Sequence, residues 1–441
     1  FNSAKGDMSP EKITSADMGY IFEELIRKFS ESYDEQAGAH FTSRDIIYLM
    51  TELLVAPEKE QIMAEGCTKT AYDMAMGTSQ MLGCLTERLQ EISEDAALTC
   101  FGQEFNPETY AIAKADMLIK GGNASGMKYG DTLSDDAFTG YEFDYIISNP
   151  PFGIDWKREK SQVENEAKRG FDGRFGPGLP AISDGQMLFM LNGVKKLKEG
   201  SGRMAIIQNG SSLFTGDAGS GASEIRRYVI EGDLVEAIIQ LPTDLFYNTG
   251  ISTYIWVLTK GKAMHRSGKV QLIDASKCFV KRRKNIGSKR VDLDDACIDL
   301  ILRAYEGFVD ETYEENGLAV ESKVFDNSFF GFTKVTVETA QADAKGKPVL
   351  KKGKKQPVKG ASDTEIIPLS EDVDAYMEKN VLPYNPLAYI DHTKDKIGYE
   401  VPFTRLFYKF VPPESSDAIF EEIKALEAEE TILMKELFGH E

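Results

Sequence analysis

Residues 68–104 read TKTAYDMAMGTSQMLGCLTERLQEISEDAALTCFGQE and decide the fold. Two short runs within this stretch, 69–73 and 98–101, carry the β-branched and aromatic residues that are typical of buried strands. Between them, residues 79–92 place apolar side chains at the spacing of one helix face. A strand, a helix and a second strand in this order predict two parallel strands joined by a crossover helix.

The alternation continues toward the C-terminus. We expect helices near 107–119, 185–197 and 222–230, and strands at 143–148, 203–208, 235–241 and 254–258. Strands that alternate with helices form a mostly parallel sheet that is covered on both faces. The sequence therefore predicts a doubly wound α/β fold, in which ligands bind at the carboxyl ends of the strands.

Three acidic residues follow successive predicted strands. Asp73 ends the first strand, Glu104 ends the second, and Asp131 follows Gly130 at the expected edge of the same crevice. A carboxylate at a strand tip can accept hydrogen bonds from both ribose hydroxyls of a nucleoside, and one at the edge can bind an adenine amino group. Each acid alone is typical of a solvated loop, but the series of three predicts a nucleoside site.

A proline motif follows the apolar strand at 143–148. It reads Asn149-Pro150-Pro151-Phe152. Pro150 forces Asn149 out of the helical region, so the directions of the Asn149 amide and the Pro150 carbonyl are fixed. These two oxygen acceptors can hold both hydrogens of one exocyclic amino group, and Phe152 offers a face on which a planar base can stack. A proline turn that merely ends the strand is the alternative, but the motif favours a role in catalysis.

Composition restricts the class of protein. The 441 residues include 51 Lys and Arg against 71 Asp and Glu, which gives a formal net charge of −20. Such an acidic average argues against a protein that grips nucleic acid through overall charge. Five cysteines without a C-x-x-C pair argue against a disulfide framework or a zinc site, and they fit a reducing cytoplasm. No apolar run approaches a membrane span of about 18 residues, so we expect no membrane partner.

The proline motif and the acidic series resemble the amino-methyltransferases that act on adenine N6 in DNA. More narrowly, the chain resembles the modification (methyltransferase) subunit of type I restriction-modification systems. The other segments that carry this resemblance are AHFTSR at 39–44, GQEFNPETY at 102–110, DGQ at 184–186 with LF at 188–189, LPTDLFYNTGI at 241–251 and GYEVPFTR at 398–405. The last two segments are specific to that subunit.

The resemblance implies a Rossmann-like methyltransferase core with S-adenosylmethionine as methyl donor and no metal. It assigns Asn149, Pro150, Pro151 and Phe152 to catalysis, Glu104 to the ribose and Asp131 to the adenine ring of the donor. The residues expected near the donor's methionine end and first turn are His40, Phe41, Thr42, Ser43, Arg44, Asp73, Gly77, Thr78, Ser79 and Gln80. The implied partners are DNA, reached through a complex, a specificity subunit, a second modification subunit and, in complete systems, an endonuclease subunit.

One departure from the family pattern concerns the turn after the first strand. The family motif reads approximately Asp-Pro-x-x-Gly-Thr-Gly-Gly, whereas Met74, Ser79 and Gln80 replace its proline and its last two glycines here. We expect these side chains to crowd the donor and to weaken or alter its binding. Alternatives to the main interpretation are a stand-alone DNA methyltransferase, a methyltransferase of RNA or of protein glutamine, and a non-catalytic nucleoside-binding scaffold.

Four regions are expected along the chain. Residues 1–66 form the helical end of a truncated domain and lead into a catalytic domain at 67–285. An irregular extension follows at 286–365, and residues 366–441 form a C-terminal arm with a partner-binding helix. Amphipathic helices are expected around 14–29 and 42–53 in the first region. Because the first residue is not Met, we expect the chain to begin inside a longer protein.

Two features of the C-terminal half suggest contacts. Seven lysines lie close together among Gly and Pro, which predicts a mobile basic loop that is either solvated or in contact with phosphates. They are Lys345, Lys347, Lys351, Lys352, Lys354, Lys355 and Lys359. Residues 415–438 carry an apolar stripe at alternating spacings of four and three, which is typical of a short coiled coil and predicts a partner helix.

Overall fold

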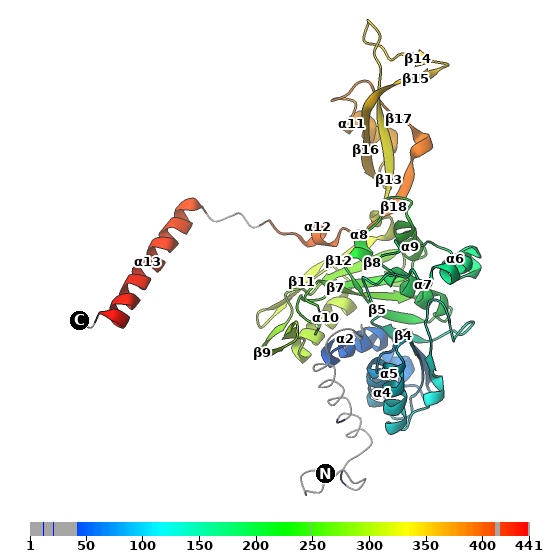
Figure 1. The fold of residues 1–441 in the computed structure, drawn as a ribbon, viewed down its shortest axis with the longest axis vertical. Coiled ribbons are helices and arrows are strands. Elements are labelled where there is room, and N and C mark those ends of the chain that lie inside the picture. The colour runs from blue at the N-terminus through cyan, green and yellow to red at the C-terminus, as the bar shows by residue number, and fades with distance from the viewer. Residues whose placement is uncertain (1–11, 13–20, 22–41, 248, 411–414, 440–441) are drawn as a thin grey trace. The chain divides into compact units, whose positions relative to one another are not determined.

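The computed structural model describes residues 12, 21, 42–247, 249–410 and 415–439 (Figure 1). The helix expected around residues 14–29 falls outside these ranges, apart from position 21. Contacts divide the chain into two units, Phe1–Pro402 and Phe403–Glu441.

A ten-stranded sheet forms the centre of the first unit. Its strands in spatial order are β11 (Glu311–Glu315), β12 (Leu318–Asp326), β8 (Lys269–Asp274), β6 (Val235–Gln240), β7 (Thr253–Thr259), β5 (Arg203–Asn209), β4 (Tyr145–Ser148), β1 (Thr68–Asp73), β2 (Ala97–Glu104) and β3 (Met127–Tyr129). Five of the nine pairings are parallel, namely the four from β5 to β3 and the pairing of β6 with β8. β7 runs antiparallel to both of its neighbours, and β11 and β12 are also antiparallel.

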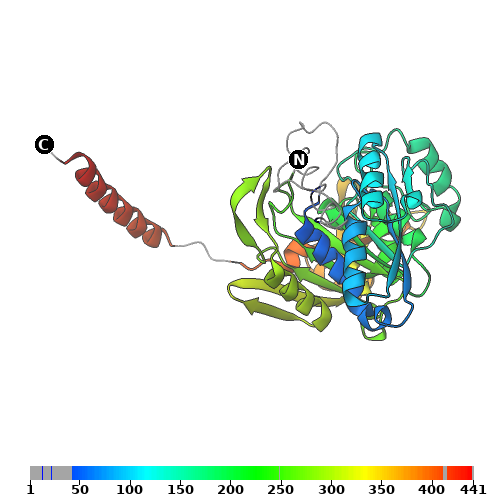
Figure 2. The same ribbon diagram turned by 90° about the horizontal axis from the view of Figure 1, so that it is seen from below.

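Helices cover both faces of the sheet. They are α2 (Arg44–Val55), α3 (Lys59–Ile62), α4 (Gln80–Ile92), α5 (Pro107–Ile119), α6 (Lys160–Ala167), α7 (Gln186–Lys196), α8 (Ser211–Phe214), α9 (Gly221–Glu231) and α10 (Asp295–Gly307). α2, α4, α5 and α10 share one hydrophobic cluster with the side chains on one face of the central strands, and Figure 2 shows α2 beside α4. On the other face, Gly193 of α7 lies against Met204 of β5. The doubly wound fold is therefore confirmed.

The order of the strands places the crevice of the sheet between β1 and β4. β1 pairs with β2 on one side and with β4 on the other, so the chain changes direction across the sheet at this point. All four residues of β4 are buried, as expected for a strand that is covered on both faces. Ligands of doubly wound folds bind outside the carboxyl ends of the strands at such a switch point.

Residues 286–365, which we expected to be irregular, contain regular strands. β9 (Val280–Ile286) and β10 (Lys289–Asp292) form a hairpin, and a separate sheet contains β13 (Gly331–Ala340), β16 (Pro357–Pro368), β17 (Ala388–Ile390) and β18 (Lys396–Tyr399). Val335, Val337 and Ile367 are buried there, together with Met377 of α11 (Val373–Asn380) and Ala388. Alternating valines on one face of β13 thus form a small core that our interpretation of the composition overlooked.

The expected mobile basic loop is also a structured element. β14 (Leu350–Lys351) and β15 (Lys354–Lys355) form a two-stranded hairpin between β13 and β16. Its turn consists of Lys352 and Gly353, which both have positive φ, 52° and 79°. Two positive φ values are what a tight hairpin turn requires. The many lysines led us to expect a loop, and the sequence analysis did not recognise Lys352-Gly353 as a hairpin turn.

The second unit contains α12 (Phe403–Phe407) and α13 (Ser416–Phe438). Ser415 caps α13 by accepting a hydrogen bond from the Ala418 N–H at 3.2 Å, so the helix expected at 415–438 is present. Among the described residues, no helix is long and apolar enough to cross a membrane.

Candidate functional site

The predicted site residues gather at the carboxyl ends of β1, β2, β3 and β4. Asp73 ends β1, Glu104 ends β2, Asp131 follows β3 by two residues, and Asn149 follows β4 directly. These strands are parallel neighbours in the order β4, β1, β2, β3. The structure therefore brings the acidic series and the proline motif to one edge of the sheet, as the sequence predicted.

Asn149 is buried, with 7% of its surface exposed. Its Nδ2 donates a hydrogen bond of 2.9 Å to the Thr42 hydroxyl, whereas its Oδ1 is buried and has no hydrogen-bond partner within the described part of the chain. A buried acceptor without a partner costs about 1–3 kcal/mol. Its presence at the switch point indicates that a ligand N–H completes the site.

The rest of the proline motif has a fixed environment. Pro150 is buried, Pro151 is half-buried, and Phe152 is a half-buried residue that packs against the main hydrophobic cluster. The next residue, Gly153, has a φ of 72°, and its N–H donates to Asp184 Oδ1 at 3.3 Å. The motif is held from both sides, since Thr42 binds its first residue and Asp184 binds the backbone that follows it.

The segment before α2 supplies Thr42 and Ser43 to the site. Both are buried, and the Ser43 hydroxyl donates to Asp45 and accepts from Lys289 Nζ at 3.1 Å. Arg44 is the first residue of α2 and is half-buried. Two further residues expected here, His40 and Phe41, lie outside the described residues.

Gly77 and Glu104 meet at the turn between β1 and α4. The Gly77 N–H donates to Glu104 Oε2 at 2.9 Å, and the Asn106 N–H donates to Oε1 at 2.8 Å. Burial raises the pKa of Glu104, and both backbone hydrogen bonds oppose that rise. Gly77 has a φ of 53°, and an added Cβ would meet no atom within 4 Å. The backbone at Gly77 is therefore open to a ligand, and Glu104 is fixed beside it.

The substituted end of this turn is more compact than a glycine loop. Thr78 is half-buried, and Ser79 is 1% exposed with a left-handed φ of 68°. The Ser79 hydroxyl points to Met127 Sδ at 3.9 Å, and Gln80 is buried as the first residue of α4. Ser79 thus adopts a backbone conformation that favours glycine, with its side chain packed inward against β3.

Asp73 is almost completely buried and joins β1 to β4. Its Oδ1 accepts the Ser148 hydroxyl at 2.7 Å and the Ala75 N–H at 3.1 Å. Burial raises the pKa of Asp73 to about 7, an effect that the nearby charge of Glu104 reinforces and the two hydrogen bonds oppose. Strongly perturbed carboxyl groups in a crevice are typical of functional sites.

Asp131 begins the turn that follows β3. Its Oδ1 accepts hydrogen bonds from the Leu133 and Ser134 N–H groups at 2.7 and 2.8 Å. Next to it, the Thr132 hydroxyl donates to the Met74 carbonyl at 2.6 Å. This bond ties the loop after β3 to the loop after β1, so the two acidic strand ends keep a fixed separation.

A family model for the N-6 DNA methylases matches residues 14–342. The chain belongs to the N-6 DNA methylase family. The resemblance that the motifs suggested is thereby confirmed. The relatives identify the kind of methylase that the chain is similar to. Matches among characterised proteins include methylase subunits of type I restriction enzymes from Methanocaldococcus jannaschii and Haemophilus influenzae.

These relatives differ in how much of their length the chain represents. The MjaIX methylase subunit of M. jannaschii is 26% identical over 271 residues, which are 61% of this chain and 46% of the relative. The HindI methylase subunit of H. influenzae is 26% identical over 343 residues, 76% of this chain and 71% of the relative. The solved type I methyltransferase subunit from Streptococcus thermophilus is 28% identical to this chain, and the two structures superpose with a TM-score of 0.58. The match covers 70% of this chain and 60% of the S. thermophilus chain.

A polar network beside the Asn149–Phe152 motif was not predicted from the sequence. Gln186 Nε2 donates to Asp184 Oδ2 at 2.7 Å and to Asn209 Oδ1 at 2.7 Å, and the Ser211 hydroxyl donates to Asp184 Oδ2 at 2.7 Å. Asn209 ends β5, so the rule that ligands bind at carboxyl strand ends could have identified it. The network fixes Asp184 and, through it, the Gly153 backbone.

A buried lysine was also missed. Lys289 of β10 is 1% exposed, and its Nζ donates to Asp45 Oδ2 at 2.9 Å and to the Leu245 carbonyl at 3.0 Å. Together with its bond to Ser43, these contacts fasten the segment that supplies Thr42. The sequence did not mark Lys289, because its three hydrogen-bond partners lie more than 40 residues away in the chain; Asp292, with which it forms an ion pair at 3.2 Å, is its neighbour on β10.

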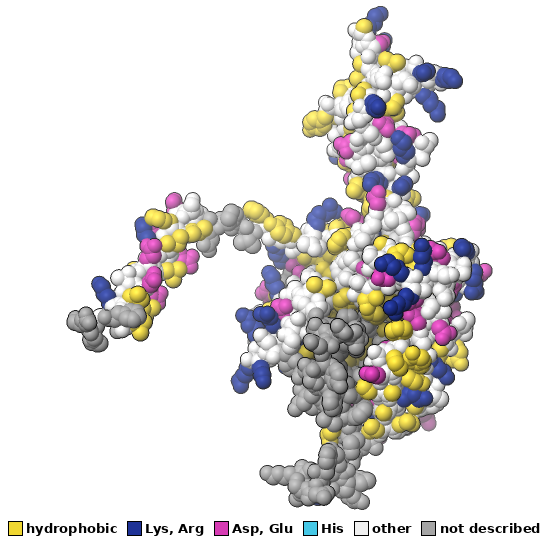
Figure 3. All heavy atoms as spheres, viewed as in Figure 1, with side chains coloured by type: hydrophobic (Ala, Val, Ile, Leu, Met, Phe, Trp, Pro, Cys, Tyr) yellow, Lys and Arg dark blue, Asp and Glu magenta, His cyan; other side chains and the backbone are white. Residues whose placement is uncertain are grey.

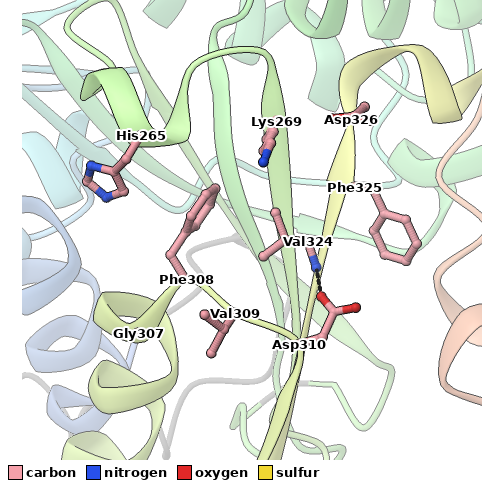
Figure 4. Close-up of a pocket in the computed structure, with 9 residues that line it drawn as sticks. All are labelled: His265, Lys269, Gly307, Phe308, Val309, Asp310, Val324, Phe325 and Asp326. Atoms are coloured by element: carbon pink, nitrogen blue, oxygen red, sulfur yellow. Dashed lines mark hydrogen bonds between the residues drawn. The ribbon is translucent and has the colours of Figure 1, made fainter.

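A separate hollow lies away from the strand ends that form the site. It has a volume of about 530 Å³ (Figure 4), and it is lined by His265, Lys269, Gly307, Phe308, Val309, Asp310, Val324, Phe325 and Asp326. Lys269 begins β8, so the hollow lies at the amino edge of that strand, whereas the site lies at carboxyl ends. Asp310 Oδ1 accepts the Val324 N–H at 2.7 Å there, so this carboxylate has a structural role in holding the β12 backbone. Across the described residues, no group of three or more His, Cys, Asp or Glu side chains could hold a metal ion.

Proposed function

We propose that the chain is the modification subunit of a type I restriction-modification complex and transfers a methyl group from S-adenosylmethionine to N6 of adenine in DNA. The observation that carries this proposal is the buried Oδ1 of Asn149, which no described residue satisfies, at the switch point of a doubly wound sheet. Membership of the N-6 DNA methylase family supports the choice of adenine N6.

The site suits an exocyclic amino group. Asn149 Oδ1 and the Pro150 carbonyl are acceptors, so together they match the two hydrogens of that group. Phe152 follows two residues later in the chain, and aromatic rings hold a base by its face. An adenine within a duplex cannot present its amino group to a buried acceptor, so the base would have to be flipped out of the helix. These residues would orient the amino group for transfer, and its surplus proton would leave to water.

The donor would bind at the turn that contains Gly77, where the backbone is open to a ligand. S-adenosylmethionine supplies an activated methyl group when bound. Glu104 would accept the ribose hydroxyls, since carboxylate oxygens can each accept more than one hydrogen bond, and Asp131 would bind the adenine ring. The inward-facing Ser79 argues against the crowding that the sequence suggested at that position, whereas Gln80 retains a buried Nε2 that no described residue satisfies.

A titration of the chain with donor tests the cofactor proposal. We expect S-adenosylmethionine to bind in isothermal calorimetry and Glu104→Gln to weaken it, since a neutral amide accepts ribose hydroxyls less strongly than a carboxylate. Absence of heat at millimolar donor would contradict a site that is complete within this chain. The control is Glu371→Gln, which changes an exposed acid between β16 and α11.

The choice of acceptor needs its own assay. The 441-residue chain, with and without a coexpressed specificity subunit, would be incubated with labelled donor and with DNA, RNA or protein. We expect label in DNA adenine. Label in RNA or in protein glutamine would favour the corresponding alternative enzyme, and donor binding without transfer to any of the three would favour a scaffold.

The proposed partner surface is the apolar stripe of α13. Its side chains are 44–74% exposed in the structure: Ile419, Ile423, Leu426, Leu433 and Leu437. A stripe at this spacing buries its side chains by pairing with another helix, and we assign that helix to a specificity subunit that would bring DNA and a second modification subunit. Removing residues 415–441 should abolish copurification with that subunit and leave donor binding intact.

A further inference from the structure

A lysine-rich hairpin tip, residues 344–360, has no role in the proposed site. It contains seven lysines and no acidic residue, and all seven are exposed. Figure 3 shows the dark blue side chains of the lysines gathered on this tip. The family match ends at residue 342, so the tip lies outside the matched region.

The tip has a firm base. β13 and β16 pair in antiparallel register from Phe332 opposite Pro368 to Ala340 opposite Pro357, and β18 pairs with β13 at the end away from the tip. β18 is in turn attached to the catalytic unit, because the buried Arg226 of α9 donates to the Tyr399 carbonyl at 2.6 Å. Ten residues of β13 span roughly 30 Å, so the lysines stand well away from this anchor.

The arrangement of the lysines costs stability instead of providing it. Lys351 and Lys354 are directly opposite each other in the β14–β15 pairing, and like charges at such positions are destabilising. Within the part of the chain that the structure describes, none of the seven lysines has an ion-pair partner; Lys355 Nζ lies 5.1 Å from the Tyr389 ring centroid. The nearby Asp343 carboxylate accepts the backbone N–H groups of Lys345 and Lys347.

Concentrated positive charge on an otherwise acidic protein indicates a polyanionic partner. With seven lysines on the tip, the rest of the chain has a formal net charge of −27, so nucleic acid would be repelled from most of its surface. The absence of arginine and of an aromatic residue from 344–360 removes the side chains that most often read or stack on bases. What remains matches the regularly spaced phosphates of a duplex.

We propose that the lysine tip binds the phosphate backbone of duplex DNA outside the methylated site. The proposal rests on the proposed function for the identity of the polyanion. The contact is independent of sequence, and the roughly 30 Å reach of β13 corresponds to about nine base pairs of duplex. The tip thus contributes affinity for DNA that flanks the target.

Salt dependence of binding tests this inference in the full chain. The probe is a duplex of arbitrary sequence of about 40 base pairs, and the slope of log affinity against log salt changes by about 0.9 for each phosphate that the protein no longer neutralises. We expect Lys351→Gln with Lys354→Gln to reduce the slope by about 2, and adding Lys345→Gln and Lys347→Gln to reduce it by about 4. These positions spare the turn at Lys352.

A charge-matched control separates local contact from net charge. Lys269→Gln with Lys379→Gln removes two exposed lysines, one at the amino edge of β8 and one on α11, and should leave the slope unchanged. The inference is wrong if the control and the tip variants change the slope equally. It is also wrong if the tip variants leave the slope unchanged; loss of a protein partner in those variants would then assign the tip to a protein contact. Because the probe requires no methyl transfer, an inactive chain with a tip-dependent slope would refute only the proposed function.

Discussion

Replacing Thr42 with Val tests whether the orientation of Asn149 controls the rate. Valine has nearly the shape of threonine but lacks the hydroxyl that accepts the Asn149 Nδ2 hydrogen bond of 2.9 Å. Both side chains are buried, so Nδ2 would lose its partner in a place that water does not readily reach. An unsatisfied buried donor costs about 1–3 kcal/mol. The amide would lose its preference for the orientation that presents Oδ1 to a ligand.

The expected effect falls on the rate of methyl transfer. If the whole cost appears in the barrier, kcat drops about 5- to 150-fold. Thr42→Ser keeps the hydroxyl and should recover most of the rate. The reasoning is refuted if Thr42→Val has the wild-type rate, or if Ser and Val variants are equally slow.

Two further predictions concern stability. The pKa of Asp73 is raised to about 7, so the native state keeps a proton that the unfolded state has lost between about pH 4 and 7, and stability falls as pH rises through this window. Asp73→Asn should remove this dependence, gaining about 2–3 kcal/mol over wild type between pH 5 and 8 in urea unfolding; a difference that is constant with pH would contradict it. Ser79→Gly should stabilise the fold by about 0.5–1 kcal/mol, since relief of the left-handed conformation exceeds the entropy cost of glycine; a lower midpoint in urea would show that the Ser79 side chain contributes more than its backbone strain costs.

Local patterns were sufficient to predict the strands β1, β2 and β4, whose ends form the candidate site. β1, β2 and β4 are short apolar runs that end in polar residues. β1 and β4 end at the predicted residues, Asp73 and Ser148, whereas β2 continues beyond its predicted run to Glu104. Strand ends of a parallel sheet meet at one edge, so the clustering of Asp73, Glu104 and Asn149 followed from topology. The order of the strands was not needed for that inference.

Contacts between distant parts of the chain could not be predicted in the same way. Thr42 and Asn149 are 107 residues apart, and Lys289 is 246 residues from Ser43. No periodicity within either segment specifies such a pair, because each pair forms only when segments that are distant in the chain come together in the folded protein. The β14–β15 hairpin was not predicted for another reason. Its turn places Lys352 in a left-handed conformation, which is uncommon for a residue other than glycine.

The acidic average was an incomplete guide to the partners of the chain. Positive charge is concentrated on the tip at 344–360, and the apolar stripe of α13 is exposed. DNA binding would then depend on a local basic element and on a partner subunit, instead of on the total charge. The chain alone should bind duplex weakly at physiological salt, as its mobility in a gel-shift assay would show.

Asn149→Ala is the most direct test of the central claim. The variant removes the buried Oδ1 that no described residue satisfies and retains Gly77, Glu104 and Asp131 at the proposed donor site. We predict that methylation of DNA adenine by the assembled complex is lost while S-adenosylmethionine still binds with wild-type affinity. Methylated adenine at the wild-type level in DNA treated with the Asn149→Ala complex would contradict the account.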